Sequence, residues 1–219
     1  MILLRTVAGI DYGVVEAGDV AAMAQVIAHS FFRHEPVSCA LGLSQAQLNQ
    51  TVTAFGPKAS AEGLSIVARA GATEETVGAL LVEDFATPPP DSLDLLIPVL
   101  APVLAMLDEL DERYRQATPS RPGECLHLFL IGVLDGWAGR GIAQEMVRMC
   151  LANGTAKGYR RAVTEATGSI SQRVFDKIGF ERRFFTRYQE FELDRQRPFA
   201  SILGHEGCAL MERHITEAP

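Results

Sequence analysis

The stretch LHLFLIGVLDGWAGRGIAQEMV, Leu126–Val147, decides the fold of this chain. An unbroken apolar run leads into a glycine-rich turn, Gly136 to Gly141, and then into an amphipathic helical pattern. Glycines let a backbone approach a ligand closely, and a following helix adds free N–H groups and its positive dipole end. The turn is therefore a candidate anion site between a buried strand and a helix.

Two familiar phosphate loops do not fit this turn. It has no G-K-[ST] ending for a P-loop, and Gln144 stands where a dinucleotide fingerprint needs its third Gly or Ala. A Rossmann fold also needs parallel strands on both sides of the turn, whereas only one strand-helix-strand unit follows, so it is the less favoured alternative. From the turn alone, a further alternative is that its glycines only form a tight turn and start a helix, without binding a ligand.

Composition places the chain among soluble globular proteins. It has 219 residues, 47% of them hydrophobic and 21% charged, which suits one domain over 1–219. No apolar run is long enough to span a bilayer, and the opening MILLRTVAG is too short for a signal peptide, so we expect a cytoplasmic protein without a membrane partner.

Charge limits the classes of partner. A net charge of -7 and a pI near 5.3 argue against nucleic acid and agree with a cationic small molecule. The one basic cluster, ERRFFTRY at Glu181–Tyr188, predicts a strand with a solvated basic face rather than an RNA-stacking surface.

The cysteines predict neither a metal site nor a redox pair. They are widely spaced, with no CxxC pair and no His cluster at metal spacing. We expect reduced, mostly structural thiols among Cys39, Cys125, Cys150 and Cys208.

Periodicity in the N-terminal half predicts alternating helices and strands. In chain order these are a strand over Tyr12–Gly18, a helix over Val20–Phe32 capped by Asp19 and ending before His34, a helix over Ser44–Phe55 capped by Ser44 and stopped by Gly56-Pro57, and a hairpin of Leu64–Ala70 with Thr76–Phe85. After TPPPDS, leucines at spacings of three and four predict a long helix around Leu100–Tyr114.

The C-terminal half completes an α/β domain with a mixed sheet and helices on both faces. The predicted elements are a strand over Cys125–Leu134, a helix over Arg140–Lys157, a strand over Tyr159–Thr167, a short helix over Ser169–Ile178, a long strand over Gly179–Leu193 and an edge strand over Gly207–Ile215.

Several features from His127 onward, taken together, resemble the GCN5-related N-acetyltransferase (GNAT) superfamily. They are the apolar strand, GRGIA in place of the R/Q-x-x-G-x-G/A signature, the AKGY helix end, and FDKIGFE where the family commonly has YEKLGFE. The resemblance implies a single-domain GNAT fold, with a mixed, mostly antiparallel central sheet flanked by helices. It also implies a cofactor-binding core at about 125–182, preceded by an extra long helix.

Acetyl-CoA is the cosubstrate that this resemblance implies. In the family, loop amides and the helix N-terminus bind its pyrophosphate, and the preceding strand splays from its neighbour and pairs with the pantetheine arm. The implied pantetheine strand is Ile131, Gly132 and Val133, and the implied pyrophosphate loop is Gly139, Arg140, Gly141, Ile142 and Ala143. Ala138 replaces the usual Arg or Gln, which removes one polar contact and leaves the amides.

A general base is implied at Glu35. The segment FFRHEPV, Phe31–Val37, resembles the F-F-x-x-E-P stretch of arylalkylamine-type N-acetyltransferases, where the glutamate acts as base through ordered water. A glutamate after a helix and before a proline can sit rigidly in a partly desolvated cleft. The alternative is a solvated residue at a helix end. Lone histidines are more often structural, so His34 and His127 stay outside the predicted site.

The group that protonates the leaving thiolate is not evident. Phe175 stands where many family members have Tyr, and phenylalanine has no proton to donate. The arylalkylamine-like branch implies Ser169 and Ser171, for which helix capping by Ser169 and simple exposure of Ser171 are the alternatives. Tyr188 and solvent are further candidates.

The implied function is N-acetylation of a small primary amine, arylalkylamine- or polyamine-like, by direct transfer in a ternary complex. Cys150 shows no sign of activation, which disfavours an acyl-cysteine route. The alternatives are a GNAT enzyme for an aminoglycoside, amino acid or peptide, and a non-catalytic acyl-CoA-binding module. We expect a monomer or a homodimer paired through the terminal strand.

Overall fold

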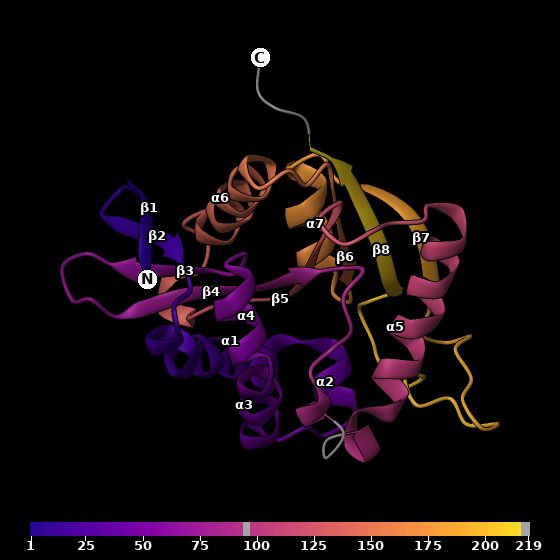
Figure 1. The fold of residues 1–219 in the computed structure, drawn as a ribbon. Coiled ribbons are helices and arrows are strands. Elements are labelled where there is room, and N and C mark those ends of the chain that lie inside the picture. The colour runs from indigo at the N-terminus through magenta and orange to yellow at the C-terminus, as the bar shows by residue number, and fades with distance from the viewer. Residues whose placement is uncertain (94–96, 216–219) are drawn as a thin grey trace.

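One twisted sheet of eight strands organises the computed structural model, which describes residues 1–93 and 97–215 (Figure 1). The strand order is β1-β2-β3-β4-β5-β6-β8-β7, and every pair is antiparallel except β5 with β6. This is the mixed, mostly antiparallel α/β sheet predicted from the sequence. The strands are β1 (Ile2–Val7), β2 (Ile10–Val14), β3 (Ile66–Ala70), β4 (Thr76–Asp84), β5 (Cys125–Val133), β6 (Arg161–Ala166), β7 (Glu181–Arg187) and β8 (Gly207–His214).

Helices cover both faces of the sheet. On one face lie α1 (Val20–His34), α2 (Pro36–Ala40), α3 (Gln45–Ala54) and α4 (Gly56–Glu62), with the long α5 (Ile97–Ala117) over the β7 end; α6 (Ile142–Ala156) and α7 (Ser169–Lys177) lie on the other (Figure 1). Short 3-10 turns are η1 (Ala17–Asp19), η2 (Asp91–Leu93) and η3 (Asp135–Trp137). No helix in the described part of the chain is both long and apolar enough to cross a membrane.

Alternation along β5 divides the core between these layers. Leu126 and Leu128 pack with the α6 and α7 residues, whereas Cys125 packs with those of α5 on the opposite face. Because successive strand side chains point to opposite faces, the apolar run of β5 contributes side chains to the cores on both faces of the sheet.

Local signals explain several helix ends. Ser44 caps α3 through a capping box with Gln47, an interaction that stabilises a helix by about 1 kcal/mol. Glu35 has extended backbone torsions because it precedes Pro36, so α1 ends there and α2 begins. The helix includes Arg33 and His34, two residues beyond the predicted Val20–Phe32.

The structure differs from the predicted strands and helices in three places. Residues 2–7 form a strand that was not predicted, and it lies mostly exposed at the sheet edge, without the alternation that marks a half-buried strand. The helix α3 ends before Gly56-Pro57 as predicted, but these two residues also open the unpredicted α4, since proline is favoured in a first helical turn. The terminal strand β8 lies between β6 and β7, so it is not an edge and β7 takes that place.

Asp19 does not cap α1 with its side chain, in contrast to the prediction. Its carboxylate instead accepts from the Glu16 N–H at 2.9 Å and pairs with Arg69 and the Met1 ammonium group. These partners lie far from Asp19 in sequence or on the preceding loop, so a capping preference alone did not reveal them. The carboxylate ties β3 and the start of β1 to the α1 entrance.

Candidate active site

The site begins where β5 and β6 separate. The two strands pair only over 125–127 with 161–163, and the Thr164 hydroxyl then donates to the Leu128 carbonyl at 2.8 Å. Beyond this point β5 continues along β4 as far as Val133, but within the described chain no strand pairs with its other edge. A free strand edge can hydrogen-bond an extended ligand.

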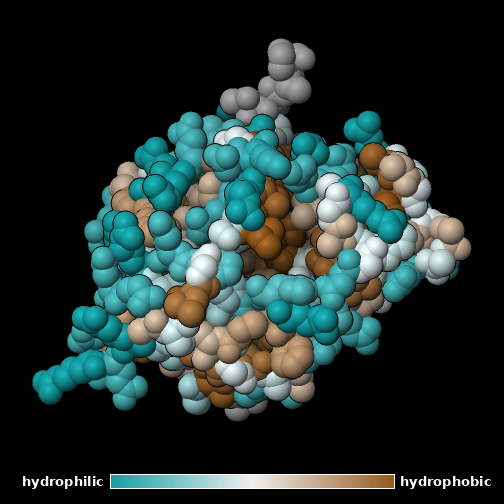
Figure 2. Space-filling view, turned by 180° about the vertical axis from the view of Figure 1, so that it is seen from behind, coloured by the Kyte–Doolittle hydropathy of each residue, from teal (hydrophilic) through white to brown (hydrophobic). Residues whose placement is uncertain are grey.

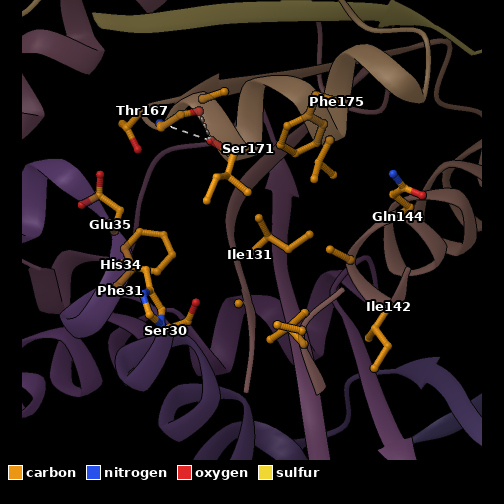
Figure 3. A pocket seen from close by; sticks show the side chains of 18 of the residues that line it. Ser30, Phe31, His34, Glu35, Ile131, Ile142, Gln144, Thr167, Ser171 and Phe175 are labelled. Atoms are coloured by element: carbon orange, nitrogen blue, oxygen red, sulfur yellow. Dashed lines mark hydrogen bonds between the residues drawn. The ribbon is translucent and has the colours of Figure 1, made fainter. Parts of the chain in front are cut away.

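A cavity of about 910 Å³ occupies this opening. One end is the glycine turn with the start of α6, and the other is the end of α1 with Glu35; Ile131 of β5 lies between them (Figure 3). The face turned away from the viewer in Figure 1 has a hollow with hydrophobic residues at its bottom (Figure 2). The two strands therefore open a route between two chemically different ends.

Backbone conformation shapes the glycine end. Gly139 and Gly141 have φ values of +76° and +78°, and a Cβ on either would meet nothing within 4 Å. These glycines are therefore needed for their left-handed backbone and not for space. Because α6 begins at Ile142, its first N–H groups have no intrahelical partners and are free for an anion.

Seven of the eight residues predicted to bind the cofactor line this cavity. They are Ile131, Gly132, Val133, Gly139, Gly141, Ile142 and Ala143. The eighth, Arg140, does not line it: its guanidinium lies 4.6 Å from the centre of the Trp137 ring and donates to the Gly136 carbonyl at 3.1 Å.

Glu35 lines the opposite end of the cavity and is half-buried. Its Oε1 accepts from the Val37 N–H at 3.0 Å and its Oε2 from the Ser38 N–H at 2.5 Å, so the carboxylate caps α2. Two backbone donors hold the group in one orientation while each oxygen keeps a further lone pair. Glu35 is thus a fixed acceptor rather than a free surface side chain.

The α7 serines behave differently from one another. Ser171 lines the cavity, and its hydroxyl donates to the Gly168 carbonyl at 2.8 Å and accepts from the Gly168 N–H, so Ser171 and not Ser169 closes the helix start. Ser169 lies outside the lining, and its N–H donates to His205 Nδ1 at 3.1 Å.

The other candidate acids are engaged or unsuitable. Phe175 lines the cavity but is only 1% exposed and packs edge-on against Phe180. Tyr188 donates its hydroxyl to the Thr167 carbonyl, and burial raises the pKa of this phenol. Tyr188 also lies outside the cavity lining, so neither residue supplies a free acid at the site.

A buried ionic network lies beneath the point where the strands separate. His127 Nδ1 is 3.1 Å from Glu83 Oε1, His127 Nε2 is 2.6 Å from Glu165 Oε2, and Lys58 binds Glu83 at 2.5 Å. Burial alone would lower the pKa of His127, but the two carboxylates outweigh it and raise this pKa well above its usual value. The network cross-links β4, β5 and β6, and Glu165 also contributes to the cavity lining.

Asp111 of α5 completes this network. Burial and the neighbouring Glu165 raise the pKa of Asp111 to about 9. One oxygen of each carboxyl group, Asp111 Oδ1 and Glu165 Oε1, is buried without another partner. A protonated Asp111 donating to Glu165 satisfies both oxygens and leaves the network with balanced charge.

Many of the lining residues were not predicted, among them Asp135, Thr167, His205 and Phe129. Asp135 lies in η3, Thr167 and His205 lie on loops, and Phe129 lies on β5. Phe129 had no reliable sequence signal either, because the pairing of β5 with β4 shifts at this residue, so that Phe129 packs with the α1 layer and Ile131 with the α6 layer. The loop residues come together only through the turns of the fold.

The cysteines contribute nothing to the cavity. Cys125, Cys150 and Cys208 are buried, Cys39 is exposed, and none of the four lines it. Burial raises the pKa of the Cys150 thiol, as expected for a packed residue. Among residues 1–93 and 97–215, no group of His, Cys, Asp or Glu is arranged to hold a metal ion.

Comparison with solved structures identifies the fold. The C-terminal condensation domain of Ebony, solved in complex with beta-alanyl-dopamine, is 18% identical with a TM-score of 0.83. Arylalkylamine N-acetyltransferase 2 from Aedes aegypti is 16% identical with a TM-score of 0.79, and a Drosophila melanogaster polyamine N-acetyltransferase that forms N-acetylagmatine is 16% identical with a TM-score of 0.73. Each match covers 94% of this chain and 99% of the other.

No protein-family model matches the sequence. The structural matches nevertheless extend over almost the whole chain, beyond the C-terminal half that carries the sequence resemblance. The chain has the GNAT fold, which confirms the fold class expected from its sequence.

Proposed function

We propose that this protein is an acetyl-CoA-dependent N-acetyltransferase that acts on a small primary amine by direct transfer in a ternary complex. The observation that carries the proposal is the separation of β5 from β6, which joins an anion-binding turn to a fixed carboxylate through one cavity. The turn suits the anionic pyrophosphate of acetyl-CoA, and the carboxylate at the other end suits a cationic amine. The amine-acetylating neighbours support the same reaction class.

The residues of the cavity fit acetyl-CoA. Free α6 amides after Gly141 suit its pyrophosphate, and the unpaired edge of β5 near Ile131 and Val133 suits the amide groups of its pantetheine arm. Lys177 lines the same cavity and adds a positive charge. Acetyl-CoA would supply the acetyl group as a thioester, and β5 N–H groups near Val133 would donate to its carbonyl oxygen.

Glu35 acts as general base in this mechanism. Its carboxylate, fixed by the Val37 and Ser38 N–H groups, takes a proton from the bound ammonium group through ordered water. The neutral nitrogen then attacks the thioester carbonyl. As the C–S bond breaks, the nitrogen gives up its second proton and the departing thiolate takes up one, which leaves the amide and the free thiol. Glu35 therefore prepares the nucleophile and does not form a covalent link.

Ser171 is the α7 residue best placed to protonate the departing thiolate, for which its hydroxyl has to give up the hydrogen bond to the Gly168 carbonyl. Ser171 belongs to the cavity lining, whereas Ser169 does not and donates its N–H to the lining residue His205. Ser169 then supports the helix start through His205, and solvent remains the competing proton source. Because no cysteine lines the cavity, transfer goes directly to the amine and not through an acyl-cysteine.

The acceptor end favours an amine with one cation and an apolar body. Phe31, Phe129 and Ile170 line it. Its carboxylates are already engaged, since Asp135 faces basic side chains and Glu165 binds His127. We therefore place an arylalkylamine before a polyamine, whose second ammonium group would need a further acidic partner.

The test is acetyl-CoA turnover, read as free thiol release, with tyramine-like amines, polyamines, aminoglycosides, amino acids and peptides. Cofactor binding is measured by calorimetry with the same protein. Glu35→Gln is compared with Glu109→Gln, which removes an exposed carboxylate on α5. We expect turnover with small aryl amines, an about hundredfold or larger loss in Glu35→Gln, and unchanged cofactor affinity in both variants.

Each alternative gives a different result. Cofactor binding without turnover of any amine would favour the non-catalytic acyl-CoA-binding module. Turnover restricted to aminoglycosides, amino acids or peptides would keep the reaction and replace the acceptor. A protein that does not bind acetyl-CoA at all would overturn the proposal, because the glycine turn would then not be a pyrophosphate site.

A further inference from the structure

Asp135 lies between the two ends of the cavity and faces three basic side chains of α1. Its carboxylate is 2.6 Å from His34 Nε2, 2.9 Å from Arg33 Nε and 3.6 Å from His29 Nε2. The hydrogen bond from His34, with the neighbouring charges, lowers the pKa of Asp135. One carboxylate therefore contacts three basic side chains from the last turns of α1.

This cluster is directly connected to Glu35. His34 is the last residue of α1 and Glu35 follows it, with the Glu35 N–H still donating to the Phe31 carbonyl at 3.1 Å. The position of the Glu35 backbone therefore follows the position of the last α1 turn. Whatever holds that turn against β5 also sets where the Glu35 carboxylate stands.

Asp135 is also connected to the glycine turn. It is the first residue of η3, and its carbonyl accepts from the Ala138 N–H at 3.2 Å, immediately before Gly139. Its side chain and its backbone therefore reach opposite ends of the cavity. Asp135 itself belongs to the cavity lining.

A second contact shows that α1 is held close to β5 before it reaches Asp135. At Gly132, a Cβ would lie 3.0 Å from Ser30 Cβ and 3.1 Å from Ile27 Cα. The helix and the strand therefore touch at Gly132, and the Asp135 cluster holds the helix end beyond this contact. Two separated contacts define a direction for the helix, whereas one would leave its end free to pivot.

We propose that Asp135 is a positioning residue that holds Glu35 in register with the cofactor strand. The proposal rests on the proposed function, in which Glu35 is the base. A single exposed ion pair contributes little because solvent screens it, but three partners on one carboxylate fix a helix end more firmly than one. The residue acts through α1, because its carboxylate is engaged by α1 side chains.

The experiment compares Asp135→Asn, Asp135→Glu and Glu190→Gln. Glu190→Gln is the matched control because it removes another exposed carboxylate, 3.8 Å from Arg187 and outside the cavity lining. Steady-state kinetics use the best amine from the panel, and calorimetry uses acetyl-CoA alone. We expect Asp135→Asn to lower kcat by about tenfold with cofactor affinity within about twofold, Asp135→Glu to recover most of it, and Glu190→Gln to change nothing.

Amide hydrogen exchange supplies a readout that does not need turnover. In Asp135→Asn, the N–H groups of the last α1 turn and of Glu35 should exchange about tenfold faster, while those at Gly132 keep their protection. Wild-type turnover with unchanged kcat in Asp135→Asn would overturn the positioning role and leave the proposed function standing. A wild type that turns over no amine would overturn both. Equal losses of cofactor affinity and kcat in Asp135→Asn would also overturn the positioning role, because they would indicate a general structural role for Asp135.

Discussion

The two ends of the cavity are built in different ways. The glycine end consists of backbone: left-handed residues at Gly139 and Gly141, the first amides of α6 and the free edge of β5. The amine end consists of side chains from separate elements, with Phe31 and Glu35 from the end of α1 and Phe129 from β5. Backbone chemistry is the same for every residue type, whereas the second end depends on which side chains meet.

This difference predicts how each end responds to mutation. A backbone-built end is sensitive to conformation and tolerant of side-chain identity, so Arg140 can point away from the cavity without loss of the turn. A side-chain-built end is sensitive to identity and to the positions of helices. Substitutions can therefore separate cofactor affinity from amine selectivity.

The largest effect is expected from the buried ionic network of Lys58, Glu83, His127, Glu165 and Asp111, beneath the point where β5 and β6 separate. In the unfolded chain an aspartate is ionised above pH ~4, whereas folded Asp111 keeps its proton up to a pKa of about 9. Since the folded state then binds more protons, the free energy of unfolding falls by about 1 kcal/mol per pH unit as the pH rises towards 9. His127, with its raised pKa, adds a loss in the same direction above its unfolded value.

Asp111→Asn removes the titrating proton while keeping a neutral donor to Glu165. We expect urea unfolding between neutral pH and about pH 9 to show a shallower decline for this variant than for wild type. Glu112→Gln, an exposed change on the same helix, is the control and should keep the wild-type slope. Parallel slopes in all three proteins would rule out a buried proton on Asp111.

Gly141→Val tests the backbone-built end. A β-branched residue is strained at the φ of +78°, so the turn has to change shape and cofactor affinity should fall by about tenfold or more. The amine KM at saturating cofactor should stay within about twofold. Calorimetry and steady-state kinetics measure the two quantities.

Gly136→Ala is the control for that experiment. Gly136 belongs to the same turn but is not among the positive-φ residues, and a Cβ there would meet nothing within 4 Å. It should bind the cofactor as wild type does. A similar loss in both variants would mean that glycine content, and not the left-handed conformation, matters.

Phe31→Leu tests the side-chain-built end. Phe31 lines the cavity, whereas its neighbour Phe32 is 48% exposed and does not. We expect Phe31→Leu to raise the KM for aryl amines by about fivefold, because ring contact is lost, with unchanged cofactor affinity. Phe32→Leu should leave both constants unchanged. An effect of the two variants on cofactor affinity would contradict the separation of the ends.

The smallest effect is expected at Ala138, which has no polar side chain to offer the cofactor. Ala138 is exposed and lines the cavity next to the glycine turn. Ala138→Arg adds one charge-assisted donor and should tighten acetyl-CoA binding by about threefold in calorimetry at low salt. Ala138→Leu, of similar reach without charge, should give no gain. Equal tightening in both would point to apolar contact instead.

Much of the glycine end was predictable from the sequence, because its parts are contiguous. The apolar strand, the turn and the following helix occupy Leu126–Val147, and the structure has β5, η3 and α6 in that stretch. Seven of the eight expected cofactor residues line the cavity, although their role remains a prediction. Only the direction of Arg140 was not evident, since rotamers and ring contacts depend on neighbours.

Away from the glycine end, the sequence singled out Glu35 and Ser171 among the lining residues, and their roles remain predictions. Thr167 and His205 lie on loops, and the loop of His205 comes before a strand that pairs between β6 and β7. No local pattern shows that β8 takes this inner position, because strand order depends on long-range pairing. The contacts of Asp135 with α1 were likewise not predictable, because they form only when α1 packs against β5.

The sequence by itself determined the α/β class, most helices and strands, and the left-handed glycine turn, because periodicity, capping and glycine conformation are local properties. The tertiary structure alone decided that β5 leaves β6 after three paired residues, that His127 lies between two glutamates, and that Asp135 joins α1 to the cofactor turn. These features depend on packing helices and strands from distant segments, and the energy of such contacts has no signature within any one segment.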